Sequence, residues 1–183
     1  MEENETGSIL IALEPWIPFS RESDIYSKGV KVQTLPNTTS RKFPRAKHNG
    51  WIHERYKMTH EGGIYEHLLL DAENRVLESS GSNFIGVRDE NTLVVPFDSI
   101  LIGLARQIFI DAVKNSNFTV VCEPPSLAEV LEMKEAFLCS ASRGVFPIVE
   151  IDKKPVGEGV PGPIFQILDN LYRTQLASEM VPL

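Results

Sequence analysis

The sequence predicts a mixed α/β protein, in which strands and helices share one core without strict alternation along the chain. Three observations support this fold class. The chain has 183 residues, 42% of them hydrophobic, which is enough for one domain with a substantial core. Short apolar runs bounded by Asp- and Asn-containing turns are typical of strands. Two longer segments carry apolar residues at helical spacing.

The N-terminal part is expected to hold two strands, a linker and a helix. Residues 8–16, "SILIALEPW", have the pattern of a strand that runs into the Pro-rich segment 15–29, which has the composition of a linker. Residues 29–35, "GVKVQTL", form the second predicted strand. Residues 48–61 are mixed in composition and are expected to be helical.

Two β-hairpins are predicted next. The segments "IYEHLLLD" (64–71) and "RVLESS" (75–80) flank the turn sequence "DAEN". Residues 83–96, "NFIGVRDENTLVVP", repeat the pattern with "RDEN" as their turn.

The C-terminal half is expected to mix helices and strands. A helix from Gly103 to Asn115 is indicated because Leu104, Ile108 and Ala112 recur at helical spacing. The patterns then predict a strand at 118–124, a short helix with a capping box at Ser126 and Glu129, and strands at 135–142 and 144–152. An amphipathic helix is predicted over 160–176, with Pro163 near its first turn. One face of this helix carries Ile164, Ile167, Leu168 and Leu171.

Composition excludes several classes of protein. The formal charge of −7 and the pI near 5.2 argue against a nucleic-acid partner. No apolar run is long enough to span a membrane. The start, "MEENETGS", is unlike a secretory signal or a transit peptide, so a cytoplasmic protein is expected. Cys122 and Cys139 are expected to be buried free thiols, and neither they nor the four histidines have metal-site spacing.

The stretch "VLESSGSNFIGV", residues 76–87, places a carboxylate between two predicted strands. Glu78 follows an apolar run and precedes small and polar residues that include Ser82 and Asn83. A hairpin needs only two residues to turn, so the extra small residues indicate room for a bound group. A solvated turn is the alternative.

Three further segments carry candidate ligand contacts. Gly103 comes directly before a helix, where the N–H groups of Leu104 and Ala105 could bind a phosphate; an ordinary helix start is the alternative. In "LCSASRGVFPI" an apolar strand gives way to small hydroxyl residues beginning at Ser140, which could contact a phosphate or simply form a turn. The neighbouring Arg143 is expected to be solvated, with an anion contact as the alternative. In "FPRAKHNGW", Lys47 lies in a short polar stretch.

In this order, these motifs resemble the pyridoxal-phosphate enzymes of fold type IV, the class-IV aminotransferase family. That family includes branched-chain and D-amino acid aminotransferases and aminodeoxychorismate lyases. The resemblance covers about residues 30–175, and its most specific parts are "YEHLLLDAENRVLESSGSNFIGV" and "LIGLAR". It implies a large C-terminal domain with mixed sheets in a barrel-like arrangement, flanking helices and pyridoxal 5′-phosphate as cofactor.

The resemblance also implies a reactive lysine, and spacing selects Lys47 for this role. In the family this lysine lies a little over twenty residues before the "YE"-like pair and about thirty before the glutamate. Lys47 lies 19 residues before Glu66 and 31 before Glu78, whereas Lys31 lies 35 and 47 residues before them. The amine must be neutral to attack the cofactor aldehyde, which burial and a nearby positive charge, such as Arg45, would favour.

The other roles are implied by analogy. Glu78 would accept a hydrogen bond from the pyridinium nitrogen, with the residues after it, including Ser82 and Asn83, passing beneath the ring. Gly103, Leu104 and Ala105 would hold the phosphate, with Ser140 and Ala141 as a second clamp. Here the sequence departs from the family, which commonly has hydroxyl residues where this chain has Ala105 and Ala141. The phosphate is therefore expected to be held less tightly, by about 1 kcal/mol for each lost hydrogen bond.

The family normally carries a small N-terminal domain, which residues 1–29 would represent only by its last strand and the linker, with residues 30–183 as the cofactor-binding domain. The expected activity is transfer of an amino group between an amino acid, of branched-chain or D type, and a 2-oxo acid. A lyase of the aminodeoxychorismate lyase type and a truncated, non-catalytic homologue are the alternatives. The expected assembly is a homodimer, with no nucleic-acid or membrane partner.

Overall fold

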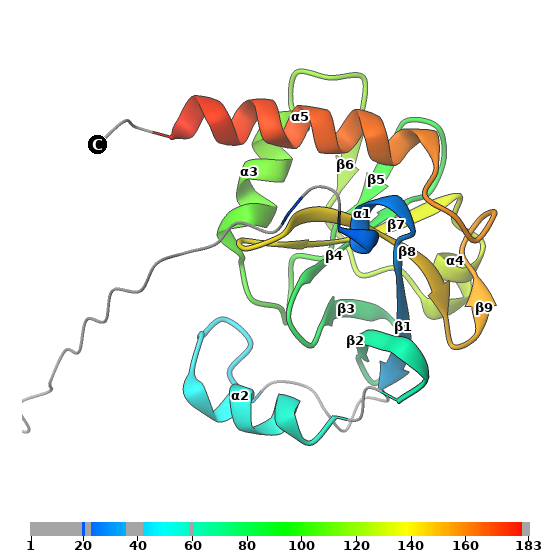
Figure 1. Ribbon diagram of the computed structural model, residues 1–183. Coiled ribbons are helices and arrows are strands. Elements are labelled where there is room, and N and C mark those ends of the chain that lie inside the picture. Colours follow the sequence, from blue (N-terminus) through cyan, green and yellow to red (C-terminus); the bar gives the residue numbers. More distant parts are fainter. Residues whose placement is uncertain (1–19, 21–22, 36–41, 59–60, 181–183) are drawn as a thin grey trace, which may run out of the picture.

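The computed structural model describes residues 20, 23–35, 42–58 and 61–180 of the protein. The strands in this part of the chain form one mixed sheet (Figure 1). Their bounds are β1 Val30–Leu35, β2 Ile64–Leu70, β3 Val76–Ser79, β4 Asn83–Val87, β5 Thr92–Val94, β6 Thr119–Val121, β7 Glu135–Ser140, β8 Gly144–Ile151 and β9 Lys154–Pro155.

Six of these strands close into a barrel. They are hydrogen-bonded in the order β3-β2-β1-β8-β7-β4, and β3 also pairs with β4, which closes the ring. Strand β1 runs parallel to β2 and β8, and the other pairs in the ring are antiparallel. Strands β5 and β6 extend the sheet from β4, and β9 pairs with β8. The predicted fold class, with mixed sheets in a barrel-like arrangement, is confirmed.

Both predicted hairpins form, and aspartate side chains build their turns. Strands β2 and β3 are antiparallel, and Asp71 Oδ1 accepts hydrogen bonds from the N–H groups of Glu73 (3.1 Å) and Arg75 (2.8 Å). Between β4 and β5, Asp89 accepts from the N–H groups of Asn91 and Thr92. An Asp side chain that bonds to the backbone after it stabilises a tight turn.

The helices are α1 Asp24–Ser27, α2 Asn49–Tyr56, α3 Leu104–Val113, α4 Leu127–Leu131 and α5 Pro163–Glu179, with a 3₁₀ turn at Glu61–Gly63. Two of them differ from expectation. Helix α1 lies in the segment expected to be a linker, where Ile25 and Tyr26 are buried in the core. Helix α2 ends at Tyr56, well before the expected position 61, and Gly62 after it has a positive φ of 68° that does not continue a helix.

Of the capping box predicted for α4, only the hydrogen bond to the serine forms. Ser126 Oγ accepts a hydrogen bond from the N–H of Glu129, as expected of an N-cap serine. The Glu129 carboxylate, however, pairs with Arg88 Nε at 2.6 Å. The ion pair with Arg88, the residue that follows β4, therefore uses the carboxylate that a reciprocal capping box would need.

The buried face predicted for α5 is correct at Leu168 and wrong at Ile167. Its buried residues include Phe165, Leu168 and Tyr172, whereas Ile167 is 52% exposed. Ile164 and Leu171 pack only partly against the core. One residue corresponds to a rotation of about 100° on a helix, and neighbouring apolar residues leave that angle ambiguous in the sequence.

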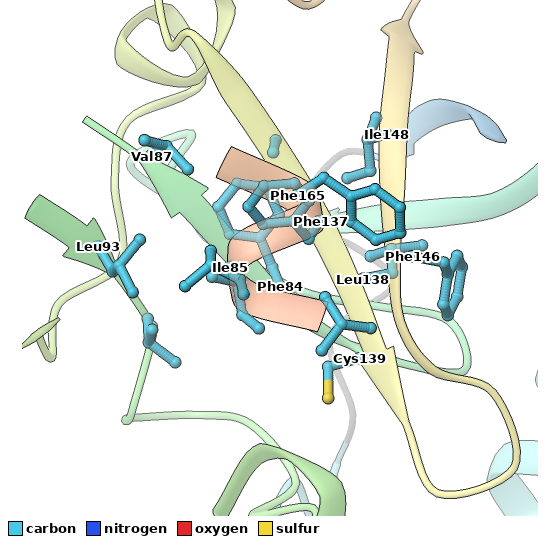
Figure 2. Close-up of a cluster of buried hydrophobic side chains, with 14 of the residues drawn as sticks. Phe84, Ile85, Val87, Leu93, Phe137, Leu138, Cys139, Phe146, Ile148 and Phe165 are labelled. Atoms are coloured by element: carbon cyan, nitrogen blue, oxygen red, sulfur yellow. The ribbon is translucent and has the colours of Figure 1, made fainter. Parts of the chain in front are cut away.

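The core packs α1, α3, α4 and α5 against the strands of the sheet. Figure 2 shows Phe84 and Ile85 of β4, Phe137 and Leu138 of β7 and Phe165 of α5 in one apolar cluster. Helices α3 and α5 contact each other and β7, and α2 lies on the opposite side of the barrel from α5 (Figure 1). That arrangement leaves the N-terminus of α3 facing the side of the barrel where β3 and β4 meet.

Two further findings concern membrane spans and the N-terminal strand predicted from the sequence. No helix among the described residues combines the length and the apolar character needed to cross a bilayer. The strand expected at residues 8–16 lies outside the described residues. The division into residues 1–29 and 30–183 therefore stays a prediction.

Candidate functional site

The residues selected from the sequence meet around one pocket of about 400 Å³. Four segments that are far apart in the chain form its walls: the loop before α2, the β3–β4 turn, the N-terminus of α3 and the β7–β8 turn. The lining residues are Lys47, Glu78, Gly81, Ser82, Asn83, Leu101, Ile102, Gly103, Leu104, Ala105, Cys139, Ser140 and Ala141. They include every residue predicted to hold or react with a cofactor.

Glu78 contributes a buried carboxylate to this pocket. It lies on β3 and is 2% exposed. Its Oε2 accepts hydrogen bonds from Asn83 Nδ2 at 3.3 Å and from the N–H of Leu101 at 3.2 Å. Both donors hold this oxygen in place. The carboxylate is therefore fixed in place and able to bind a cationic or N–H-bearing group in the pocket.

Hydrogen bonds within the protein hold the turn that follows Glu78. The N–H of Ser79 donates to Ser82 O at 2.8 Å, and Trp51 Nε1 donates to Ser80 O at 2.9 Å. A side-chain carbon at Gly81 would lie 3.0 Å from atoms of Arg55 and Glu66. An added carbon at Gly81 would therefore crowd the ends of these two side chains behind the turn, in addition to any need for room inside the pocket.

Asn83 connects β4 to the N-terminus of α3. Its Nδ2 donates to Leu101 O at 2.7 Å as well as to Glu78. Gly103, the N-cap of α3, lies so close that an added side-chain carbon would sit 2.3 Å from Asn83 Oδ1. The glycine is thus required by a close approach between two walls of the pocket.

We predict that Gly103→Ala weakens both the fold and the site. The added methyl group must displace Asn83, which loosens the contacts to Glu78 and Leu101. Overpacking of this kind is expected to lower the free energy of unfolding by about 1–3 kcal/mol. Urea unfolding measures this change. Gln107→Ala is the control, because this side chain is exposed on the same helix and its removal overpacks nothing; equal pocket-ligand affinity in Gly103→Ala and the parent protein would contradict the prediction.

Two walls of the pocket supply hydrogen-bond donors for an anion. The N–H groups of Leu104 and Ala105 lie in the first turn of α3, where backbone donors have no partner within the helix and the helix dipole favours negative charge. Ser140 adds a hydroxyl group at the end of β7. The Leu104 side chain is 70% exposed, and neither it, Ala105 nor Ala141 can donate from its side chain.

Arg106 anchors this helix start to the sheet. Its guanidinium is 1% exposed and donates from Nε (3.2 Å) and Nη2 (2.9 Å) to Pro96 O. Burial lowers the pKa of Arg106. The helix start is therefore held by a side chain that the sequence analysis did not select.

Lys47 lines the pocket from the loop before α2, but the environment predicted for it is wrong. The residue is exposed, and Arg45 is directed to Asp98, with Nη2 and Oδ1 3.4 Å apart. The described part of the chain therefore leaves the Lys47 side chain open to solvent. Lys31 lies on β1, outside this pocket, where it pairs with Glu150 at 2.9 Å.

Arg143 was expected to be solvated, and this expectation is wrong. Its side chain is 14% exposed, and Nη2 lies 2.8 Å from Oε1 of the buried Glu66. Burial lowers the pKa of Arg143, but Glu66 and Tyr65 raise it by more, so the pKa is above its ordinary value. The signal in the sequence was Glu66 itself, because a carboxylate inside an apolar strand needs a partner.

The two cysteines differ, contrary to expectation. Cys139 is buried in β7 and lines the pocket, and burial raises the pKa of its thiol to about 12. It is thus a protonated, inert thiol at neutral pH. Cys122 is exposed, because it lies after β6 has ended. Among the described residues, no group of three or more His, Cys, Asp or Glu side chains could hold a metal ion.

A family model, amino-transferase class IV, matches residues 4–151. The barrel, the pocket and this match together define the class of protein, and the chain belongs to the class IV aminotransferase family.

Individual relatives agree with this assignment. The chain is 28% identical over 170 residues to a branched-chain-amino-acid aminotransferase of Pseudomonas aeruginosa, covering 90% of this chain and 55% of the relative. The solved branched-chain aminotransferase of Thermoproteus uzoniensis with norvaline has a TM-score of 0.73 and 27% identity, covering 89% of this chain and 56% of that chain. The branched-chain amino acid aminotransferase of Escherichia coli shares the fold, with a TM-score of 0.67 and 20% identity over 86% of this chain and 54% of that chain. The chain spans about half the length of the relatives described here.

Proposed function

We propose that the protein binds pyridoxal 5′-phosphate in the pocket between β3, α3 and β7, and transfers an amino group between an amino acid and a 2-oxo acid. The observation that carries the proposal is the meeting of an amine, Lys47, and a buried carboxylate, Glu78, in one pocket with an anion-binding helix start. The bound cofactor would supply an aldehyde and an electron-withdrawing ring.

The residues of the pocket fit this group at its three functional ends. Lys47 would form the covalent bond with the aldehyde, releasing water, and its freed amine would later carry the proton at the substrate carbon. The carboxylate of Glu78, held by Asn83 and Leu101, would bind the ring nitrogen and keep it protonated.

The phosphate end would be held mainly by backbone groups. The N–H groups of Leu104 and Ala105 point from the start of α3, and the close approach of Gly103 to Asn83 keeps that helix start next to the ring site. Ser140 is the side-chain donor, with Ala141 adding its backbone. This donor set suits a phosphate group and provides fewer hydroxyls than the family commonly has.

The substrates are proposed from the relatives, and the assembly from the surface of this chain. The names of the matched proteins include branched-chain-amino-acid and D-alanine aminotransferases, so an amino acid of one of these types is the expected amino donor. A homodimer is the expected assembly. The exposed apolar side chain of Leu104, which lines the pocket wall itself, supports it.

Absorbance and amino-group exchange test this function directly. The purified protein with added pyridoxal 5′-phosphate is expected to gain visible absorbance, and borohydride is expected to fix the cofactor to the chain, detected as added mass. Incubation with labelled amino acids and 2-oxo acids is then expected to exchange the label. No absorbance and no added mass would disprove cofactor binding, whereas fixation without exchange would favour a lyase or a non-catalytic cofactor-binding protein.

A further inference from the structure

Arg143 joins two walls of the pocket through one buried guanidinium. Its Nε donates to Ser140 Oγ at 3.0 Å, and its Nη2 donates to Ser82 Oγ at 3.2 Å. Ser140 ends β7, Ser82 lies in the β3–β4 turn, and both line the pocket. The guanidinium therefore sets the relative position of the two hydroxyls from behind the pocket wall.

Aromatic rings and a carboxylate fix the guanidinium itself. Its carbon lies 5.4 Å from the ring centroid of Tyr65 and 5.0 Å from that of Phe146, and Nη1 donates to the Tyr65 hydroxyl at 3.0 Å. The ion pair with Glu66 balances its charge. A planar fork held in this way keeps its hydrogen-bond directions, which a lysine could not reproduce.

The two serines use their protons differently. Ser82 Oγ donates its proton to Glu66 Oε1 at 3.1 Å while accepting from Arg143. Among the described residues, Ser140 Oγ takes part in one hydrogen bond, in which it accepts from Arg143 Nε. A hydroxyl has one proton and two acceptor sites. The Ser82 proton is therefore used inside the protein, and the Ser140 proton is available to the pocket.

We propose that Arg143 is a positioning residue that orients the Ser140 hydroxyl as a hydrogen-bond donor to a phosphate monoester bound in the pocket. The proposal rests on the proposed function, which supplies the phosphate end of the ligand. It assigns Ser82 to the structural network with Glu66 and leaves Ser140 as the hydroxyl that recognises phosphate. Arg143 acts through Ser140, since its own charge is balanced by Glu66.

A thermodynamic cycle tests the coupling between Arg143 and Ser140. Its four proteins are the parent, Ser140→Ala, the double variant Glu66→Gln/Arg143→Met and the triple variant. Both charges are removed together because removing Arg143 alone would leave the buried Glu66 carboxylate unpaired. The measured quantity is the dissociation constant for pyridoxal divided by that for pyridoxal 5′-phosphate, from absorbance titrations. This ratio isolates phosphate recognition, because both ligands share the ring and the aldehyde.

Ser140→Ala is expected to lower this ratio about tenfold, the effect of one hydrogen bond to a charged group. The Glu66→Gln/Arg143→Met pair is expected to lower it by a similar factor when Ser140 is present, and by less than about twofold in the Ser140→Ala background. A general loss of structure would instead weaken both ligands alike. Independent factors that multiply in the triple variant, or a ratio unchanged by the charge pair, would overturn the proposal.

Two further proteins make the result interpretable. Arg88→Met removes an arginine that pairs with Glu129 outside the pocket, and it is expected to leave the ratio unchanged. Arg143→Lys keeps a positive charge beside Glu66 but lacks the fork, so a loss of about threefold or more in the ratio is expected even if the other variants unfold. A parent protein that binds neither ligand overturns the proposed function and this inference together. A parent that binds both ligands equally overturns this inference alone.

Discussion

Replacing Lys47 with alanine is expected to abolish covalent attachment of pyridoxal 5′-phosphate and to lower amino-group exchange by about 10²–10⁴-fold or more. The variant loses the amine that bonds to the aldehyde and carries the proton, and proton transfer by a placed side chain is by itself worth about that factor. Because Lys47 is exposed, its replacement should change the stability of the fold little. Mass spectrometry after borohydride reduction measures the attachment.

The matched control for this prediction is Lys31→Ala. Lys31 is also an exposed lysine, but it pairs with Glu150 on β1 outside the pocket. It is expected to retain both the added mass and the exchange. Added mass that persists in Lys47→Ala and disappears in Lys31→Ala would show that the wrong lysine has been assigned.

Replacing Glu78 with glutamine is expected to lower the rate of amino-group exchange by about 10²–10³-fold, as for the loss of one preorganised electrostatic contact. The amide oxygen can still accept from Asn83 and from the N–H of Leu101, so the fold should be kept. What is lost is the negative charge that keeps the ring nitrogen protonated. The ¹⁵N chemical shift of that nitrogen in labelled cofactor is expected to move toward the unprotonated value.

Glu150→Gln is the control for this second prediction, because its carboxylate pairs with Lys31 away from the pocket. It should leave the nitrogen shift and the exchange rate unchanged. Urea unfolding checks that Glu78→Gln is folded, with an expected loss of about 1 kcal/mol for weaker hydrogen bonds. A variant with the parental nitrogen shift would show that Glu78 does not contact the ring.

Local sequence signals were sufficient for most of the elements, and the family resemblance supplied the members of the pocket. Aspartate turns located both hairpins. Comparison with the spacing in the family selected Lys47, which does line the pocket. These signals depend on short stretches of chain, where side-chain chemistry and turn geometry are directly linked.

Features that depend on contacts between distant segments could not be predicted in the same way. The burial of Arg143 depends on Glu66 and Tyr65, which are more than seventy residues away in the chain. The rotation of α5 depends on how the helix meets the barrel and α3, so Ile167 was assigned to the wrong face. Each of these errors concerns tertiary packing, which periodicity alone does not specify.

The closing seam of the barrel passes through the site. In the described chain, the register between β3 and β4 consists of Glu78 opposite Asn83, the two residues that also line the pocket and bond to each other. Architecture and chemistry thus share one pair of side chains. A substitution that changes the chemistry of Glu78 or Asn83 also changes the strand pair that closes the barrel. Few residue types can therefore serve at these two positions.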